Sequence, residues 1–109
     1  MPQFQWVILT RAVDGRVKEF EEWYDGRHLA DVTAIPGVVS AVRYKVLGSA
    51  AMGMDPPHWD SLAIYNIEAD DPAVVIEAIQ KAANTAAMPI SESLGSVGVQ
   101  LLVSRVSER

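Results

Sequence analysis

Four stretches of the chain are rich in branched and aromatic residues, with apolar and polar positions alternating in residues 38–46, and apolar residues recur at helical spacing in two further stretches. Alternation predicts strands, because successive side chains of a strand point to opposite faces. A recurrence of three to four residues predicts helices with one apolar face. The expected strands are residues 4–11, 38–46, 60–67 and 97–106, and the helices begin near residues 17 and 72.

The first helix places an aromatic pair and a histidine on one face. Phe20, Tyr24 and His28 fall within an arc of about 80° if the helix continues through Gly26. Glycine inside a helix costs about 1 kcal/mol relative to alanine. We therefore expect a kink or break at Gly26, followed by a short helical piece over residues 29–34.

The second helix has a strong start signal. Asp71 supplies an acceptor at the N-cap, and Pro72 suits the first helical position. The helix is expected to run to residues 83–85, and its buried stripe is predicted to be Val75, Ile79, Ala82 and Ala86.

The element order is βαββαβ, and it predicts an α+β fold. Short connections and crossover handedness give a four-stranded antiparallel sheet with both helices on one face, a ferredoxin-like arrangement expected to span residues 1–109 as one domain. The first and last strands also carry apolar residues on their other face. A second copy packed sheet to sheet would cover that face, so we expect a symmetric homodimer.

Composition narrows the function classes. The formal net charge is −5 with no visible basic stripe, which argues against nucleic-acid binding. No apolar run approaches the roughly 18 residues of a membrane span, no signal peptide is visible, and there are no cysteines. We expect a cytoplasmic protein without membrane contact. The 50% share of hydrophobic residues again favours a subunit interface.

Two blocks of sequence resemble a known family. Residues 19–46, EFEEWYDGRHLADVTAIPGVVSAVRYKV, and residues 58–75, HWDSLAIYNIEADDPAVV, are similar to the EthD-like branch of the dimeric α/β-barrel proteins. The resemblance implies two ferredoxin-like subunits paired into a barrel. It also implies a pocket for a small apolar ligand between sheet and helices, and His28 matches the family's histidine. The superfamily includes cofactor-free monooxygenases, isomerases, polyketide cyclases, haem enzymes and proteins of no known activity, so the resemblance implies no single reaction.

His28 is the main candidate for chemistry. An imidazole with an ordinary pKa of about 6.5 suits proton transfer near neutral pH. Tyr24 lies one turn away and could orient the ring or bind a substrate oxygen, and Asp25 or Asp31 could hydrogen-bond the ring. The alternative is structural, with His28 capping the helix end or bonding a backbone carbonyl.

The remaining aromatic residues are candidates for a ligand cavity. Trp6, Trp23, Tyr44 and Tyr65 could line it or serve as plain core. His58 and Trp59 could form a lid, or Trp59 could cover the sheet edge. The expected site has His28 and Tyr24 as catalytic residues, and its expected substrate contacts are Phe20, Trp23, Asp25, Trp6 and Trp59.

No cofactor is expected. The two histidines and scattered carboxylates lack a compact metal-binding spacing, nothing basic is placed for haem propionates, and no glycine-rich phosphate loop is present. The first hypothesis is a small homodimer that binds an apolar or aromatic metabolite and acts as a cofactor-independent isomerase, cyclase or monooxygenase. The second hypothesis is a non-catalytic binding or stress-related dimer with a structural His28.

Overall fold

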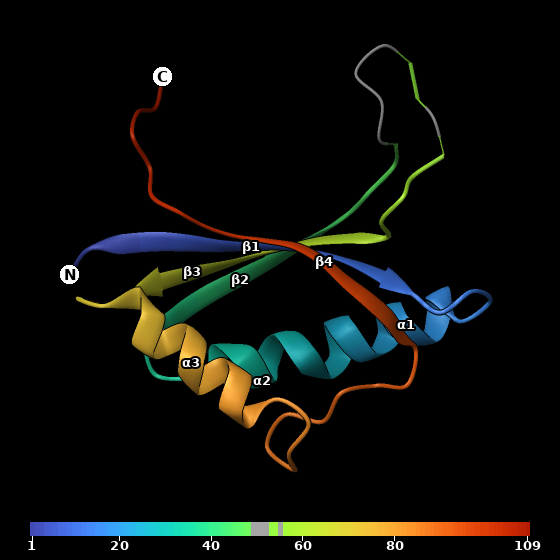
Figure 1. Cartoon of the computed structure of the whole chain (residues 1–109), viewed down its shortest axis with the longest axis horizontal. Coiled ribbons are helices and arrows are strands. Elements are labelled where there is room, and N and C mark those ends of the chain that lie inside the picture. The colour runs from blue at the N-terminus through green and yellow to red at the C-terminus, as the bar shows by residue number, and fades with distance from the viewer. Residues whose placement is uncertain (49–52, 55) are drawn as a thin grey trace.

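The computed structural model describes residues 1–48, 53, 54 and 56–109, and over these residues it shows a four-stranded antiparallel sheet with the helices on one face (Figure 1). The strand order is β2-β3-β1-β4. The predicted βαββαβ ferredoxin-like fold is therefore confirmed. The elements are β1 (Gln3–Ala12), α1 (Val17–Trp23), the π-helix η1 (Tyr24–His28), α2 (Leu29–Thr33), β2 (Val38–Lys45), β3 (Ser61–Glu68), α3 (Pro72–Ala82) and β4 (Leu94–Val103).

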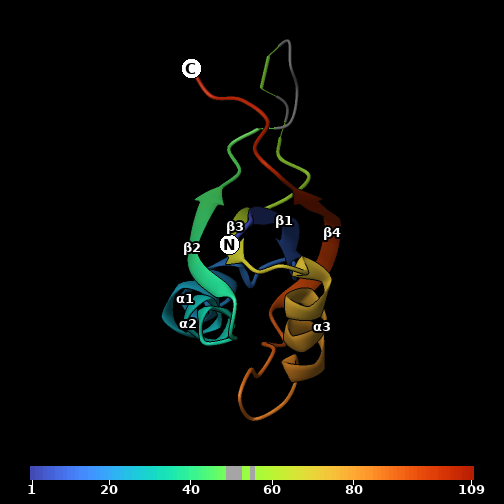
Figure 2. The ribbon, with the colours of Figure 1, turned by 90° about the vertical axis from the view of Figure 1, so that its left-hand side faces the viewer.

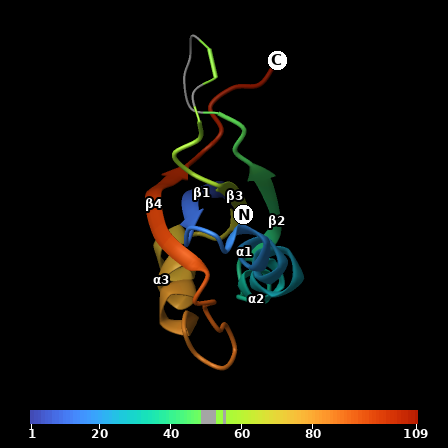
Figure 3. The same cartoon turned by 90° about the vertical axis from the view of Figure 1, so that its right-hand side faces the viewer.

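The helices lie under the two edges of the sheet. In side view, α1 and α2 run beneath β2, and α3 runs beneath β4 (Figures 2 and 3). The centre of the sheet, β1 and β3, spans the space between them. This arrangement places the buried core between sheet and helices.

The first helix does not break at Gly26, but it is irregular there, and the short helical piece expected over residues 29–34 is present as α2. The backbone keeps helical angles at both Tyr24 and His28, and one wide π-helical turn joins α1 to α2. A Cβ added at Gly26 would have nothing within 4 Å. The helix accommodates Gly26 in a wider turn and does not break there. π-helical turns of this kind occur frequently at functional sites.

The second helix begins as predicted and ends earlier than predicted. The Asp71 carboxylate accepts a hydrogen bond from the Ala73 backbone N–H at 3.0 Å, with Pro72 in the first turn. The helix ends at Ala82, and Asn84 adopts a positive φ of 65°. Ala86 therefore lies beyond the helix and is exposed, so its assignment to the buried stripe was wrong.

The two faces of the sheet differ in exposure. Trp6, Tyr65 and Ile67 point toward the helices and are buried. On the opposite face, apolar side chains from all four strands remain partly or largely exposed. The most exposed of them are Tyr44 at 54% and Leu101 at 52%.

Two details of the strands differ from prediction. β4 begins at Leu94, because the pairing with β1 extends to Ala12 opposite Leu94. A register shift follows Val38, so Val38 is buried under the helices whereas Val42 and Tyr44 lie on the other face. The segment between β2 and β3, for which the sequence predicts a loop over residues 47–58, falls partly outside the described residues.

Among the described residues, no helix is long and apolar enough to cross a membrane.

Candidate functional site

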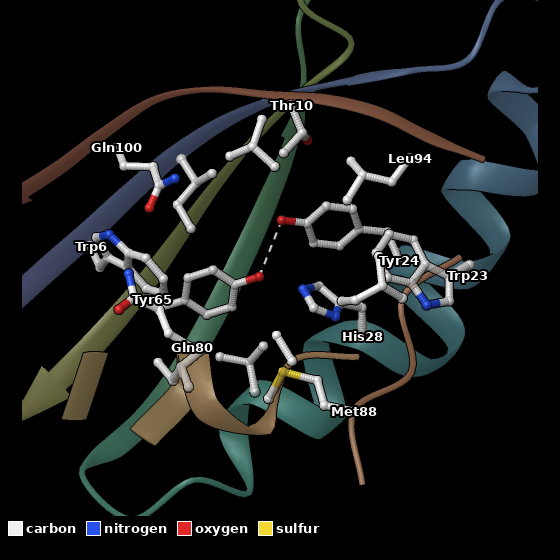
Figure 4. Close-up of a pocket in the computed structure, with 16 residues that line it drawn as sticks. Trp6, Thr10, Trp23, Tyr24, His28, Tyr65, Gln80, Met88, Leu94 and Gln100 are labelled. Atoms are coloured by element: carbon white, nitrogen blue, oxygen red, sulfur yellow. Dashed lines mark hydrogen bonds between the residues drawn. The ribbon is translucent and has the colours of Figure 1, made fainter. Parts of the chain in front are cut away.

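A cavity of about 190 Å³ lies in the space that the fold leaves between the sheet and its helices (Figure 4). Its walls come from the inner faces of β1, β3 and β4, from the α1–η1–α2 helix, and from α3 with the segment that leads to β4. Most of the lining is apolar. The polar side chains that line it belong to Thr10, Tyr24, His28, Tyr65, Gln80 and Gln100.

The π-helical turn sets the position of His28. The His28 ring stacks on the Trp23 indole, with centroids 4.6 Å apart and an interplanar angle of 28°. The Tyr24 ring meets the same imidazole edge to face at 5.0 Å. The Trp23 Nε1–H donates to the Pro89 carbonyl at 3.1 Å, which ties this cluster to the segment between α3 and β4. Three aromatic rings from one helix therefore form one wall.

The imidazole is held without a hydrogen-bond partner. Nδ1 of His28 is buried and makes no hydrogen bond within the described part of the chain. Burial lowers the pKa of His28 from 6.5 to about 4, although the nearby Asp31 carboxylate acts in the opposite direction. The ring is therefore neutral at pH 7, with one nitrogen able to donate a hydrogen bond and the other able to accept a proton.

The expected carboxylate partners of His28 are engaged elsewhere. Asp25 accepts two hydrogen bonds from Arg43, at 2.6 and 2.7 Å. Asp31 accepts one from Arg27 at 3.0 Å. Neither carboxylate hydrogen-bonds the imidazole. The alternative in which His28 caps a helix end also does not fit, because η1 continues directly into α2.

Two tyrosine hydroxyls meet beside the imidazole. Oη of Tyr24 and Oη of Tyr65 are 3.1 Å apart, and both residues are almost fully buried. Burial raises the pKa of Tyr24, whereas the hydrogen bond to Tyr65 and the Arg43 guanidinium oppose that change. Burial also raises the pKa of Tyr65. Both phenols therefore stay protonated at neutral pH.

Thr10 adds another polar group to this wall. It is 3% exposed, and its Oγ1 makes no hydrogen bond of normal geometry with the described residues, although it lies close enough to the Tyr24 phenol to counteract the rise in that pKa. A buried hydroxyl without a partner is destabilising. Thr10 and His28 thus each present an unused polar atom among the residues that line the cavity.

Arg43 forms the support behind Tyr24. Its side chain is only 8% exposed and its guanidinium carbon lies 5.7 Å from the centre of the Tyr24 ring. Glu21 adds a second carboxylate at 3.6 Å. Asp25 therefore binds Arg43 outside the cavity and is not one of the lining residues.

The structure brings together some of the residues expected at the site and separates others. Trp6 and Trp23 line the cavity with His28 and Tyr24. Phe20 is completely buried behind the wall, against Trp23 and Tyr24, and does not line the cavity.

Trp59 and Tyr44 lie on the opposite face of the sheet. A Cβ added at Gly98 would come within 2.3 Å of the Trp59 ring, so the indole lies directly against β4. With Leu9 and Leu62 it lines a separate hollow there. Trp59 therefore does not form a lid over the His28 cavity, and Tyr44 does not line it.

Two important wall residues were not anticipated. Thr10 shares the inner face of β1 with Trp6 and Ile8, and its period-two spacing was a signal that could have revealed it. Met88 is 1% exposed and closes the cavity from the segment after α3. That segment is irregular, so no periodicity pointed to Met88.

Across the described ranges, no group of three or more histidine, aspartate or glutamate side chains could hold a metal ion.

The fold and the position of the cavity define a class before any relative is considered. The chain is an α+β protein of ferredoxin-like topology whose candidate site lies between the sheet and its helices. No protein-family model and no curated protein matches its sequence. Solved structures do match its fold.

Three of these structures are instructive. An ethyl tert-butyl ether D (EthD) family protein from Bacillus halodurans C-125 is 16% identical, with a TM-score of 0.60 over 95% of this chain and 99% of that chain. A dimeric ferredoxin-like protein of unknown function from Thermobifida fusca YX is 18% identical, with a TM-score of 0.61 over 94% and 91%. A protein described only as a proposed monooxygenase, from Shewanella loihica PV-4, is 12% identical, with a TM-score of 0.64 over 98% and 97%. The fold is thus that of EthD-like, dimeric ferredoxin-like proteins, as the sequence resemblance predicted.

Proposed function

We propose that this protein is a homodimeric, cofactor-independent enzyme that binds a small apolar or aromatic compound in the His28 cavity and moves a proton beside a carbonyl group of that compound. The observation that carries this proposal is the neutral imidazole, whose buried Nδ1 has no partner in the described structure, beside two hydrogen-bonded phenols. An unused buried polar atom costs stability, so its presence favours a role in binding or catalysis.

The arrangement suits removal of a proton from carbon. The unprotonated His28 imidazole is the form that accepts a proton. One tyrosine hydroxyl donates to the other, which leaves the second hydroxyl proton free to donate to a carbonyl oxygen of the substrate. As the proton leaves carbon, negative charge develops on that oxygen, where a phenol O–H stabilises it.

The low pKa of His28 is compatible with this role. Burial disfavours the charged imidazolium, and the nearby Asp31 carboxylate offsets this only in part. An enolate formed a few ångströms away would favour the charged imidazolium and raise its pKa during the reaction. The proton could then return to a different carbon of the substrate, and the result would be an isomerisation.

The homodimer follows from the exposed apolar face of the sheet. Val99 and Leu101 on β4 are about half exposed, and Val42 and Tyr44 add apolar surface on β2. A patch that extends over all four strands is larger than the isolated exposed residues usual on monomers. The dimeric ferredoxin-like protein from Thermobifida fusca, which has the same fold, supports pairing through a second copy.

Proton exchange tests the proposed chemistry directly. Small ketones and enones would be incubated with the protein in D2O, and loss of α-proton signals would be followed by NMR. We expect exchange with the unmodified protein and a decrease of about 100-fold or more in His28→Gln. The control is Tyr44→Phe, which changes a tyrosine on the other face. Equal exchange rates with the unmodified protein and His28→Gln would contradict the proposal.

The non-catalytic dimer remains the competing function. It predicts that ligands bind without any proton exchange, or that no ligand binds and His28→Ala only lowers stability.

A further inference from the structure

The size of the cavity limits what it can hold. A dry engineered cavity of about 150 Å³ accommodates benzene. The cavity here is about 190 Å³, somewhat larger than that and well below the volume of about 300 Å³ at which drug-sized pockets begin. This volume matches one six-membered ring with one or two small substituents better than a fused pair of rings.

The walls carry no charge that could pair with an ionised ligand. Among the described residues, no lysine, arginine, aspartate or glutamate lines the cavity. The nearest guanidinium, on Arg43, is already bound to Asp25 through two hydrogen bonds. His28 is neutral at pH 7. A carboxylate would lose its hydration on entry and gain no counter-charge, which is strongly unfavourable.

The pair of tyrosine hydroxyls in the cavity lining matches a single oxygen atom. The hydroxyls of Tyr24 and Tyr65 converge from opposite walls, from the η1 helix and from β3, and their mutual hydrogen bond leaves one O–H available (Figure 4). Thr10 offers a further hydroxyl. His28, Gln80 and Gln100 add polar atoms elsewhere in the lining, and the rest of the wall is aromatic or aliphatic, with Trp6 and Met88 among its residues.

We propose that the cavity selects an uncharged compound with a single ring that carries one carbonyl or hydroxyl oxygen, and that it rejects both the corresponding carboxylate and fused-ring analogues. The oxygen lies against the Tyr24–Tyr65 pair, and the ring packs between the indoles and Met88. This inference rests on the proposed function, since it specifies the ligand class of the same cavity.

Four commercial compounds separate size from charge. Acetophenone and p-cresol are neutral, have one ring and carry one oxygen function. Benzoate has nearly the shape of acetophenone and replaces its methyl group with a negatively charged oxygen. 2-Acetonaphthone adds a fused ring and is more apolar than acetophenone, so weaker binding of this compound would reflect size and not hydrophobicity.

The indole N–H signals of the three tryptophans report where each compound binds. Trp6 and Trp23 line the cavity, and Trp59 lies on the opposite face of the sheet as an internal control. At pH 7 we expect acetophenone and p-cresol to shift the Trp6 and Trp23 signals with little effect on Trp59. Benzoate and 2-acetonaphthone should bind at least tenfold more weakly.

Matched tyrosine variants test the recognition of the oxygen. Tyr24→Phe and Tyr65→Phe each remove one hydroxyl of the pair, and each should weaken acetophenone binding by about three- to tenfold, the equivalent of one hydrogen bond. Tyr44→Phe removes a hydroxyl from the other face and should leave binding unchanged. Thr10→Val keeps the side-chain shape and shows whether that hydroxyl contributes.

The outcomes separate this inference from the proposed function. Benzoate binding as tightly as acetophenone, tighter binding of 2-acetonaphthone, or no shift of Trp6 and Trp23 with either single-ring compound would overturn the ligand class. Binding of acetophenone without exchange of its methyl protons would support the ligand class and contradict the proposed proton transfer. If only a two-ring ketone exchanged its protons, and that exchange required His28, the result would support the proposed proton transfer and contradict the ligand class.

Discussion

His28 stacks on Trp23, five residues earlier in the same helix, with ring centroids 4.6 Å apart. In a regular α-helix, residues five apart lie about 140° from one another around the axis. The wide turn of η1 removes that separation and brings both rings to the cavity. The contact gives the imidazole an apolar surrounding that keeps it neutral.

A first prediction concerns the cost of His28. Because Nδ1 is buried without a partner in the described structure, His28→Leu should leave the free energy of unfolding unchanged or raise it by up to about 1 kcal/mol. Urea denaturation measures this. A structural histidine with a satisfied hydrogen bond would instead lose about 1–2 kcal/mol on the same substitution. A loss of that size would support the non-catalytic alternative.

A second prediction concerns acid stability. The pKa of His28 is about 4 in the folded chain, against the ordinary value of 6.5. Between these pH values the unfolded chain binds a proton that the folded chain does not, so stability falls as the pH falls from about 6.5 to about 4. The full effect is about 3 kcal/mol. Above pH 6.5 this residue contributes no pH dependence.

The measurement for this prediction is a series of urea denaturations across that range. His28→Gln should flatten the stability profile between pH 4 and 6.5, and NMR titration of the imidazole gives the folded pKa independently. The Asp25 carboxylate, whose pKa the hydrogen bonds from Arg43 lower, contributes its own loss below this range. An unchanged slope in His28→Gln would show that other groups cause the acid sensitivity.

A third prediction concerns the support of Tyr24. Asp25→Asn removes the negative partner of the buried Arg43 guanidinium and should lower the free energy of unfolding by about 1 kcal/mol, discounted because the Asp25 side chain is 54% exposed. The matched control is Asp31→Asn, whose partner Arg27 is half exposed. Asp31→Asn should lower the free energy of unfolding by less than about 0.5 kcal/mol. Equal losses would mean that burial of Arg43 adds nothing to its ion pair.

A fourth prediction compares two glycines. Gly26 has a helical backbone and open space at its Cβ position, so Gly26→Ala should stabilise the fold by about 0.5–1 kcal/mol. Gly37 has a φ of +97°, and a Cβ there would lie 2.6 Å from Val75. Gly37→Ala should therefore destabilise by about 1–2 kcal/mol. Thermal denaturation of both variants checks the contrast, and destabilisation by Gly26→Ala would show that the π-turn requires glycine.

A fifth prediction concerns assembly. Leu101→Asp places a charge on the exposed apolar face of the sheet, and it should convert the proposed dimer to a monomer in light scattering after gel filtration. Val74→Asp is the control, because Val74 is 62% exposed on α3, away from that face. A dimer that survives Leu101→Asp would place the interface elsewhere.

The sequence by itself determined the order of the elements and the topology of the sheet. Alternation and helical spacing are local patterns, and Asp71 with Pro72 marks a helix start through contacts within one turn. Helical spacing also predicted that Phe20, Tyr24 and His28 turn toward the body of the protein, and Phe20 and Tyr24 are buried while Tyr24 and His28 line the cavity. The family resemblance extended these patterns to the fold that the solved structures share.

Only the tertiary structure decided which side chains share the cavity. The π-turn moved Trp23 next to His28, and the register of β1 against β3 set Tyr65 across from Tyr24. The sequence positions of Asp25 and Trp59 made both of them candidates for the site. In the structure, Asp25 turns outward to Arg43, and Trp59 packs on the opposite face of the sheet. Contacts between distant segments depend on register, bulges and local helix geometry. Those features arise when the whole chain packs, and local periodicity does not encode them.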